Sequence, residues 1–285
     1  MLDAAASGLM TGALYALLAS GFALVLSVAR TFNLAHGELI VLGGYVGEYL
    51  WRTAGLSPIA SMPLAALPSG ALVLASRPLL RRLGEPFVLR ALVLTFGLSL
   101  MLQGALQDAF SADLRMIAVP AWEEGIGLLG VRLPAGRLIV AAISVGLLLV
   151  LYLLWTKTFL GKSLRAVSQD REAACLAGIS PRRVDGIVLL LGGLLAGAVG
   201  PLFAAVHTIS PAAGLGPVTI AIVLTILAGI GRIGGLLVGG LLLGLAEAMA
   251  GWFGGAMWHD LIPLGLLVVL LRWRGGGLVS GSNRS

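Results

Sequence analysis

The chain alternates between long apolar runs and short charged segments. Runs without a charged residue cover residues 4–29, 53–76, 91–107, 138–156, 186–231 and 233–246. A helix needs about 20 apolar residues to cross the hydrocarbon layer, so residues 186–231 predict two crossings. Two shorter, largely apolar runs, residues 39–51 and 261–271, fit short spans, half-helices or re-entrant segments. The pattern therefore predicts eight or nine membrane segments.

Helices are the structure that these runs favour. Backbone amides in lipid must be hydrogen-bonded within the segment, and the runs are longer than the roughly 10-residue alternating strands of a membrane barrel. The composition agrees, with 58% hydrophobic and 11% charged residues and a mean hydropathy of +1.01. The first run follows Asp3 rather than a basic start and leads into further spans, which favours a retained helix over a signal peptide. We expect one all-α polytopic membrane bundle over residues 1–285.

The charged segments predict the orientation of the bundle. Residues 157–183 carry six basic and two acidic side chains, a local net charge of six minus two, or +4. Positive loops stay on the cytoplasmic side, which places this segment, the arginines at 77–90 around Glu85, and the C-terminus with Arg272 and Arg274 there. Residues 108–137 hold more acidic than basic side chains and are expected to face outward. The same bias explains the pI near 10.2 without nucleic-acid binding.

Glycines recur at a spacing of four residues within several apolar runs. This spacing lets helix backbones approach closely, and we interpret it as tight packing of the bundle rather than as a moving gate. The pairs are Gly8 and Gly12, Gly43 and Gly47, Gly193 and Gly197, Gly235 and Gly239, and Gly240 and Gly244.

A polar segment lies at the start of one apolar run. Asn33, His36 and Glu38 bring an amide, an imidazole and a carboxylate to membrane depth, where a charge costs on the order of 2–3 kcal/mol on insertion scales. These side chains fit either a translocation path or a structural cluster that bonds neighbouring helix ends. A metal site is disfavoured because the other histidines lie in distant segments and no His-Glu-x-x-His pattern is present.

Sequence motifs for nucleotide binding and hydrolysis are missing. Lys162 and Ser163 match the end of a phosphate-binding loop, but Thr156 stands where its first glycine is required and a membrane run precedes it. No Gly-x-Ser-x-Gly motif is present. The single cysteine, Cys175, allows neither an internal disulfide nor a cysteine metal cluster. We therefore expect a protein without ATPase activity or cofactor.

Local signals within residues 157–183 predict two helices separated by a break. Asp170 and Glu172 suit the start of a short helix, and Gly178 suits a left-handed ending. Ser180 offers a cap and Pro181 a first position for the next helix. The short helix either covers the bundle passively or forms a docking site for a cytoplasmic partner.

Two of these segments resemble a known family. Asn33-Leu34-Ala35-His36-Gly37-Glu38 is similar to the Asn-Phe/Leu-Ala-His-Gly-Glu signature of the branched-chain amino acid permeases (LivH type) of ABC importers. Glu172-Ala173-Ala174 followed by Gly178 resembles the EAA loop by which such permeases contact their ATPase subunits. The segments 95–99 and 229–235 and Glu247 follow in the family's order, so the likeness spans about residues 8–278. Leu34, where phenylalanine is commoner, and Leu190-Leu191, in place of Leu-Pro, depart from the pattern.

The resemblance implies a multi-pass permease of the bacterial inner membrane that imports branched-chain or other hydrophobic amino acids, or urea and short amides. It implies three kinds of partner: cytoplasmic ATP-binding subunits, a second permease subunit of the same or another chain, and a periplasmic substrate-binding protein. Residues 157–183 would be the coupling loop and 108–137 a periplasmic loop. The residues implied in coupling are Arg171, Glu172, Ala173, Ala174 and Gly178.

Two other classes of function remain open. An ion-coupled secondary transporter would place buried acidic residues at mid-membrane on several helices, whereas Glu38, Glu48 and Glu247 lie near the ends of their runs. A membrane-embedded enzyme built on His36 and Glu38 would need a third catalytic group, and the sequence places none nearby.

Overall fold

The computed structural model describes residues 1–84, 87–128 and 131–273, and Glu85 and Arg274, named above, lie outside these ranges. Nine helices of 14 to 28 residues form the bundle in this part of the chain. They are α1 (Leu2–Ala29), α2 (His36–Ala54), α3 (Pro58–Arg81), α4 (Phe87–Phe110), α6 (Ala135–Lys157), α9 (Pro181–Ala204), α10 (Leu215–Ala228), α11 (Ile233–Gly254) and α12 (Ala256–Trp273).

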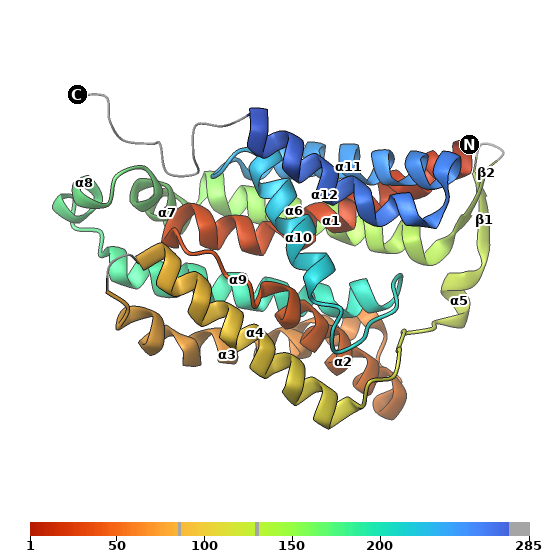
Figure 1. Cartoon of the computed structure of the whole chain (residues 1–285), viewed down its shortest axis with the longest axis horizontal. Helices are drawn as coiled ribbons and strands as arrows, with labels where there is room; N and C mark the ends of the chain where they lie inside the picture. The colour runs from red at the N-terminus through yellow and green to blue at the C-terminus, as the bar shows by residue number, and fades with distance from the viewer. Residues whose placement is uncertain (85–86, 129–130, 274–285) are drawn as a thin grey trace.

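Shorter elements connect these helices. They are α5 (Pro120–Glu123), the antiparallel strands β1 (Gly125–Leu128) and β2 (Val131–Pro134), α7 (Phe159–Gln169) and α8 (Arg171–Leu176). Figure 1 shows α7 and α8 at one end of the bundle and the two strands near the other. We call these the α8 end and the hairpin end.

The all-α bundle is confirmed, but the expected number of spans was too high. Within the described residues, six helices are long and apolar enough to cross a membrane: α1, α3, α4, α6, α9 and α11. The run 186–231 divides at an irregular connector, residues 205–214, which leaves α10 with 14 residues, or about 21 Å. The helix over 39–51 is extended by polar residues and carries Glu38, Glu48 and Arg52. By length and composition, six of the eight or nine predicted membrane segments are therefore full crossings in the described part of the chain.

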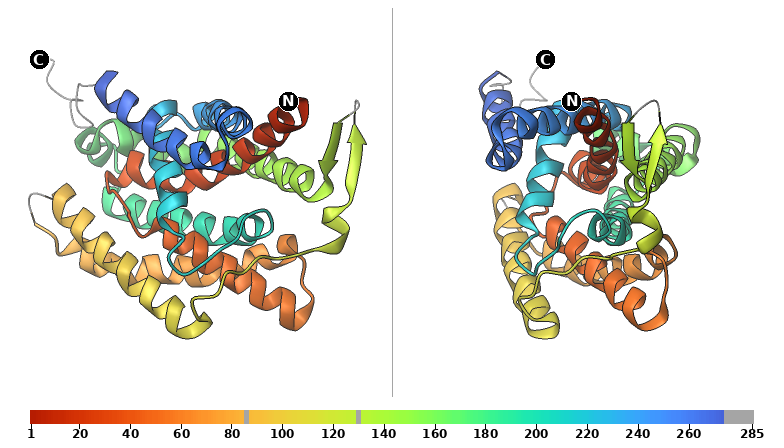
Figure 2. Two further views of the ribbon diagram at one scale, coloured as in Figure 1. Left: turned by 45° about the vertical axis from the view of Figure 1, so that its right-hand side comes forward. Right: turned by 90° about the vertical axis from the view of Figure 1, so that its right-hand side faces the viewer.

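Helix α1 forms the centre of the bundle. It packs against α6, α9, α10 and α11, and its apolar window is completely buried. The two views of Figure 2 show α6, α9, α10 and α11 around it, with α3 and α4 on the far side of the bundle. By contrast α4 and α6 expose most of their apolar side chains, and in a membrane protein such faces contact lipid.

Glycines allow the closest helix contacts, as their spacing predicted. A Cβ atom at Gly12 of α1 would lie 2.3 Å from the Gly240 carbonyl oxygen of α11. A Cβ atom at Gly43 of α2 would lie 2.1 Å from the Gly197 carbonyl oxygen of α9. Real Cβ atoms do not approach so closely, so the two backbones can touch only where both residues lack a side chain.

Helix α2 begins inside the bundle. The connection over residues 30–35 runs back from the α8 end, where α1 ends, and α2 then continues toward the hairpin end (Figure 1). The polar residues 33–38 are therefore held at depth by surrounding helices, as irregular backbone within a membrane requires.

Candidate functional site

The connection between α1 and α2 is held by one hydroxyl group of α4. Thr95 donates its hydroxyl hydrogen toward the carbonyls of Phe32 and Leu92, at 3.0 and 3.1 Å. The same oxygen accepts the Leu34 amide at 3.2 Å. Thr95 thus satisfies backbone groups that an unwound segment cannot satisfy itself. The structure brings the 95–99 segment against the Asn-to-Glu segment, although about 60 residues separate them in the chain.

His36 is fixed to α1. Its Nε2 atom lies 3.2 Å from the Leu18 carbonyl oxygen, and its ring meets Phe22 edge-on at 5.7 Å between centroids. The side chain is only 1% exposed and lies against Gly21. These contacts favour the structural role of the two that the sequence leaves open for His36.

Glu38 occupies a different environment, although it lies within one turn of His36. Its carboxyl group packs on Gly214, the residue before α10, and interacts with Ser99 of α4. Its Oε2 atom has no hydrogen-bond partner within the described residues. The carboxylate lies in the first turn of α2 and beside Gly214, the N-cap of α10. Both helix dipoles therefore stabilise a negative charge there.

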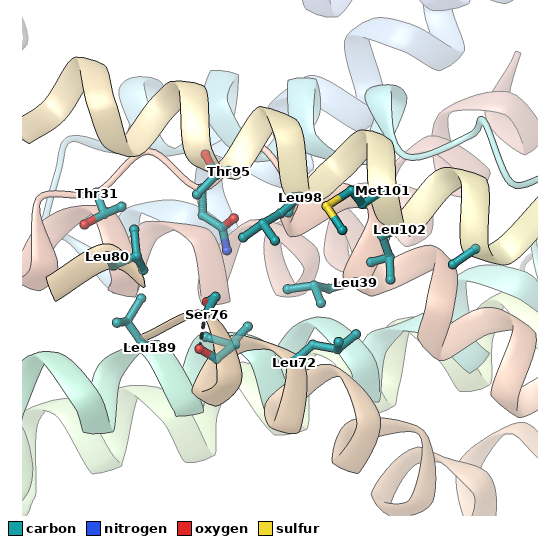
Figure 3. Close-up of a pocket in the computed structure, with 14 residues that line it drawn as sticks. Thr31, Leu39, Leu72, Ser76, Leu80, Thr95, Leu98, Met101, Leu102 and Leu189 are labelled. Atoms are coloured by element: carbon teal, nitrogen blue, oxygen red, sulfur yellow. Dashed lines mark hydrogen bonds between the residues drawn. The ribbon is translucent and has the colours of Figure 1, made fainter. Parts of the chain in front are cut away.

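Asn33 lines a separate apolar cavity between α2, α3, α4 and α9. The cavity has a volume of about 250 Å³, and Asn33, Thr31, Ser76 and Thr95 are its polar lining residues. Figure 3 shows leucine and methionine side chains of α3 and α4 pointing into it from two sides. Asn33, His36 and Glu38 therefore do not form one compact site: one lines the cavity, one contacts α1, and one faces α10.

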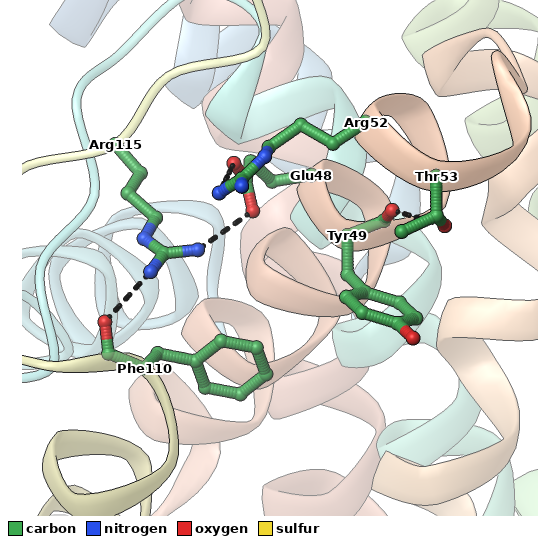
Figure 4. Close-up of polar contacts among 6 residues, drawn as sticks. All are labelled: Glu48, Tyr49, Arg52, Thr53, Phe110 and Arg115. Atoms are coloured by element: carbon green, nitrogen blue, oxygen red, sulfur yellow. Dashed lines mark hydrogen bonds and ion pairs between the residues drawn. The ribbon is translucent and has the colours of Figure 1, made fainter.

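A second polar cluster, which the sequence analysis did not identify, lies toward the hairpin end. Arg115 contacts buried Glu48 at 3.1 Å and donates to the Phe110 carbonyl at 2.8 Å (Figure 4). Its guanidinium also lies near the stacked rings of Tyr45 and Phe110. Its backbone pairs with Ile209 of the α9–α10 connector. Arg115 therefore ties the segment after α4 to α2 and to that connector, and an arginine between the acidic residues of this loop was the available signal.

The segment from α7 to α9 follows the predicted pattern of caps closely. Asp170 is the N-cap of α8 and accepts the amides of Glu172 and Ala173 at 2.9 and 3.0 Å. Gly178 has a φ of +82°, the left-handed conformation expected at this break. Ser180 occupies the N-cap of α9, but its side chain makes no capping bond there, so this detail of the prediction was wrong.

The five residues implied in coupling face two directions. Arg171 donates to the Val28 carbonyl of α1 at 3.0 Å and pairs with Asp185 of α9, and Ala174 is buried. Glu172, Ala173 and Gly178 are exposed. Leu176 and Phe159, which the sequence analysis did not single out, are 91% and 82% exposed on the same segment. One side of α8 thus holds it to the bundle, and the other presents apolar side chains outward.

Potential metal ligands do not converge in the described part of the chain. No group of three or more histidine, cysteine, aspartate or glutamate side chains is close enough to hold an ion there.

Comparison with known proteins gives one consistent family. The family model described as "Branched-chain amino acid transport system / permease component" matches residues 4–271. The high-affinity branched-chain amino acid permease protein BraD of Pseudomonas aeruginosa is 29% identical, with 96% of this chain and 94% of BraD covered. LivH of Escherichia coli K12 is 27% identical over 93% and 91%. A branched-chain amino acid permease of Methanocaldococcus jannaschii is 30% identical over 84% and 78%.

Proposed function

The chain belongs to the branched-chain amino acid transport system permease family, and from this premise we propose that it is the membrane subunit of an ATP-driven importer of hydrophobic amino acids. It is a multi-pass protein of the inner membrane. The observation that carries the proposal is the family match over residues 4–271, together with a segment between two spans that exposes Leu176 and Phe159. Urea and short amides are the alternative substrates.

ATP hydrolysis is assigned to a separate subunit, because this chain lacks a phosphate-binding loop. The surface around α8 suits docking of that subunit. Burying a leucine or phenylalanine side chain contributes about 1.5–3 kcal/mol, and Leu176 and Phe159 are both almost fully exposed. We therefore assign the α8 end to the cytoplasm, which its positive charge also favours, and residues 108–137 to the outer face.

Within the coupling segment, we assign one side of α8 to docking and the other to attachment to the bundle. Glu172, Ala173 and Gly178 lie on the side available to the ATP-binding subunit. Arg171 and Ala174 hold α8 on α1 and α9. A movement of α8 on closure of the ATP-binding subunits would therefore be transmitted to α1, the central helix. A second permease subunit and a periplasmic binding protein complete the proposed importer.

For the polar segment we assign separate roles to His36 and Glu38. His36 fastens α2 to α1, and Glu38 offers a carboxylate oxygen to the ammonium or amide N–H of a passing substrate. Asn33 contributes an amide to the neighbouring cavity.

These roles predict different outcomes for two substitutions. Glu38→Gln keeps the size of the side chain, and we expect the amount of folded protein to stay near wild type while uptake falls about tenfold, as for the loss of a charge-assisted hydrogen bond of roughly 1.5 kcal/mol. His36→Ala removes the bond to Leu18 and the ring contact, so folded protein and uptake should fall in proportion. Size-exclusion yield and initial uptake rate measure the two quantities. Parallel losses in Glu38→Gln would instead make Glu38 part of the structural cluster.

The proposed function is tested with the complete complex in vesicles. We expect leucine, isoleucine or valine, delivered by the binding protein, to stimulate ATP hydrolysis and to accumulate only when ATP is supplied. Stimulation by urea or acetamide instead would change the substrate class. Accumulation that needs an ion gradient and no ATP would support the secondary transporter. Turnover of a lipid or peptide by the isolated chain would support the membrane-embedded enzyme.

A further inference from the structure

The apolar cavity lined by α2, α3, α4 and α9 lies next to a larger, basic cavity at the α8 end. The apolar part has a volume of about 250 Å³ and the basic part about 690 Å³. Thr31, Leu80 and Leu189 line both parts. We call the two together the amphipathic cavity.

The basic part is lined by five arginines and one acidic residue, a formal net charge of five minus one, or +4. The arginines come from three regions of the chain that meet at the α8 end: the end of α1, the end of α3 and the start of α8 and α9. They are Arg30, Arg77, Arg81, Arg171 and Arg182, and the acidic residue is Asp185.

Two of these arginines bind other residues of the chain through their guanidinium groups. Arg171 pairs with Asp185, and Arg77 donates to the Arg182 carbonyl at 2.8 Å while its guanidinium lies on Gly186. Arg30, Arg81 and Arg182 have no ion pair with any residue that the structure describes. Among the described residues, these three guanidinium groups line one cavity without an ion pair, and its one acidic lining residue, Asp185, pairs with Arg171. The mutual repulsion of the three groups favours binding of an anion there.

The apolar part opens sideways between two helices. Along α4 the buried residues are Ala91, Thr95 and Leu106, and Met101 at the cavity is 73% exposed. Leu72 of α3, on the other side, is also exposed. Figure 3 shows the side chains of both helices that line this part of the cavity. Because α3 and α4 are both membrane-spanning by length and composition, this apolar slot faces the acyl chains of the bilayer.

We propose that the amphipathic cavity binds one anionic phospholipid, with its phosphate among Arg30, Arg81 and Arg182 and an acyl chain in the apolar slot. Guanidinium groups bind phosphate oxygens in a bidentate manner, and basic pockets between membrane helices on the cytoplasmic side are suited to anionic headgroups. A free amino acid fits less well, because the net positive lining would repel its ammonium group. The site lies beside Arg171, so the bound lipid would contact the side chain that joins α8 to the bundle.

The test measures how much phosphatidylglycerol the chain retains. The complete permease assembly is purified from nanodiscs that contain equal phosphatidylglycerol and phosphatidylcholine, and retained lipid is counted by native mass spectrometry. Wild type should retain one phosphatidylglycerol per chain in preference to phosphatidylcholine. The double variant R81Q/R182Q should retain at least about tenfold less. The matched control R82Q/R183Q removes the same charge from adjacent positions that do not line the cavity, and it should retain lipid as wild type does.

A third variant distinguishes a lipid from a soluble anion. Ala105→Phe fills the apolar slot and leaves all arginines in place, so it should lower the retention of phosphatidylglycerol. A soluble anion held only by the arginines would be displaced by inorganic phosphate equally from wild type and from this variant. Three results would overturn the proposal: no preference of wild type for phosphatidylglycerol, equal losses in the two double variants, or a ligand that free phosphate or leucine displaces and Ala105→Phe does not affect. None of these results depends on transport, so the proposed function is tested separately.

Discussion

Replacing Gly200 by leucine is expected to destabilise the bundle strongly. A Cβ atom at this position would lie 2.3 Å from the Gly44 amide nitrogen and 2.4 Å from the Ile40 carbonyl oxygen. Both neighbours are backbone atoms of α2, so no side chain can move aside. Overpacking a core costs typically 1–3 kcal/mol, and backbone contacts on this helix pair should take the loss above about 3 kcal/mol. For a chain of this size that corresponds to a fall in Tm of about 10 °C.

Thermal unfolding of the purified protein in detergent, with the yield of monodisperse protein, measures this effect. Gly146→Leu is the matched control, because a Cβ atom at Gly146 of α6 would meet no other atom within 4 Å and this position faces the membrane. Its Tm should not fall below that of the wild type, because leucine has a better helix propensity than glycine. A Gly200→Leu protein with the Tm of the control would show that α2 and α9 do not pack as closely as described.

The positions of the helices could largely be predicted from apolar runs, because a run of about 20 uncharged residues leaves few alternatives in lipid. The inner start of α2 could not. It depends on Thr95 of α4, which satisfies the backbone of Phe32 and Leu34. The short hairpin of β1 and β2 was also not anticipated within the outward loop. The start of α2 thus depends on a contact between segments far apart in the chain, whereas the hairpin is local and pairs Gly125–Leu128 with Val131–Pro134.

The candidate site shows the same division between local and distant contacts. Asp170 and Gly178 act where local rules placed them, because capping and left-handed endings involve residues only a few positions apart. The pair of Glu48 and Arg115 joins residues 67 positions apart and leaves no periodic signal. The inward direction of Arg171 likewise follows from Val28 and Asp185, which belong to other helices. Sequence located the segments, and the fold decided which side chains of each segment are available to a partner.

Leu176→Gln is expected to uncouple the permease from its ATP-binding subunits without unfolding it. Leu176 is 91% exposed at the end of α8, so its replacement removes no described contact within the bundle. Glutamine retains nearly the same size and helix propensity. If Leu176 fills a pocket of the ATP-binding subunit, the loss of about 1.5–3 kcal/mol of burial lowers affinity roughly 10- to 100-fold. Co-purification of the ATP-binding subunits and substrate-stimulated ATP hydrolysis should both fall.

Leu114→Gln provides the control at the opposite end of the molecule. Leu114 is 73% exposed in the segment after α4, and its replacement should leave association with the ATP-binding subunits unchanged. Glu172→Lys should weaken association as Leu176→Gln does, because it reverses a charge on the exposed side of the same helix. Since Glu172 also lies in the first turn of α8, part of its effect would come from the helix dipole, about 0.5 kcal/mol. Normal co-purification and uptake with both α8 variants would exclude α8 as the coupling surface, and proportional losses in Leu114→Gln would indicate a general defect of the assembly.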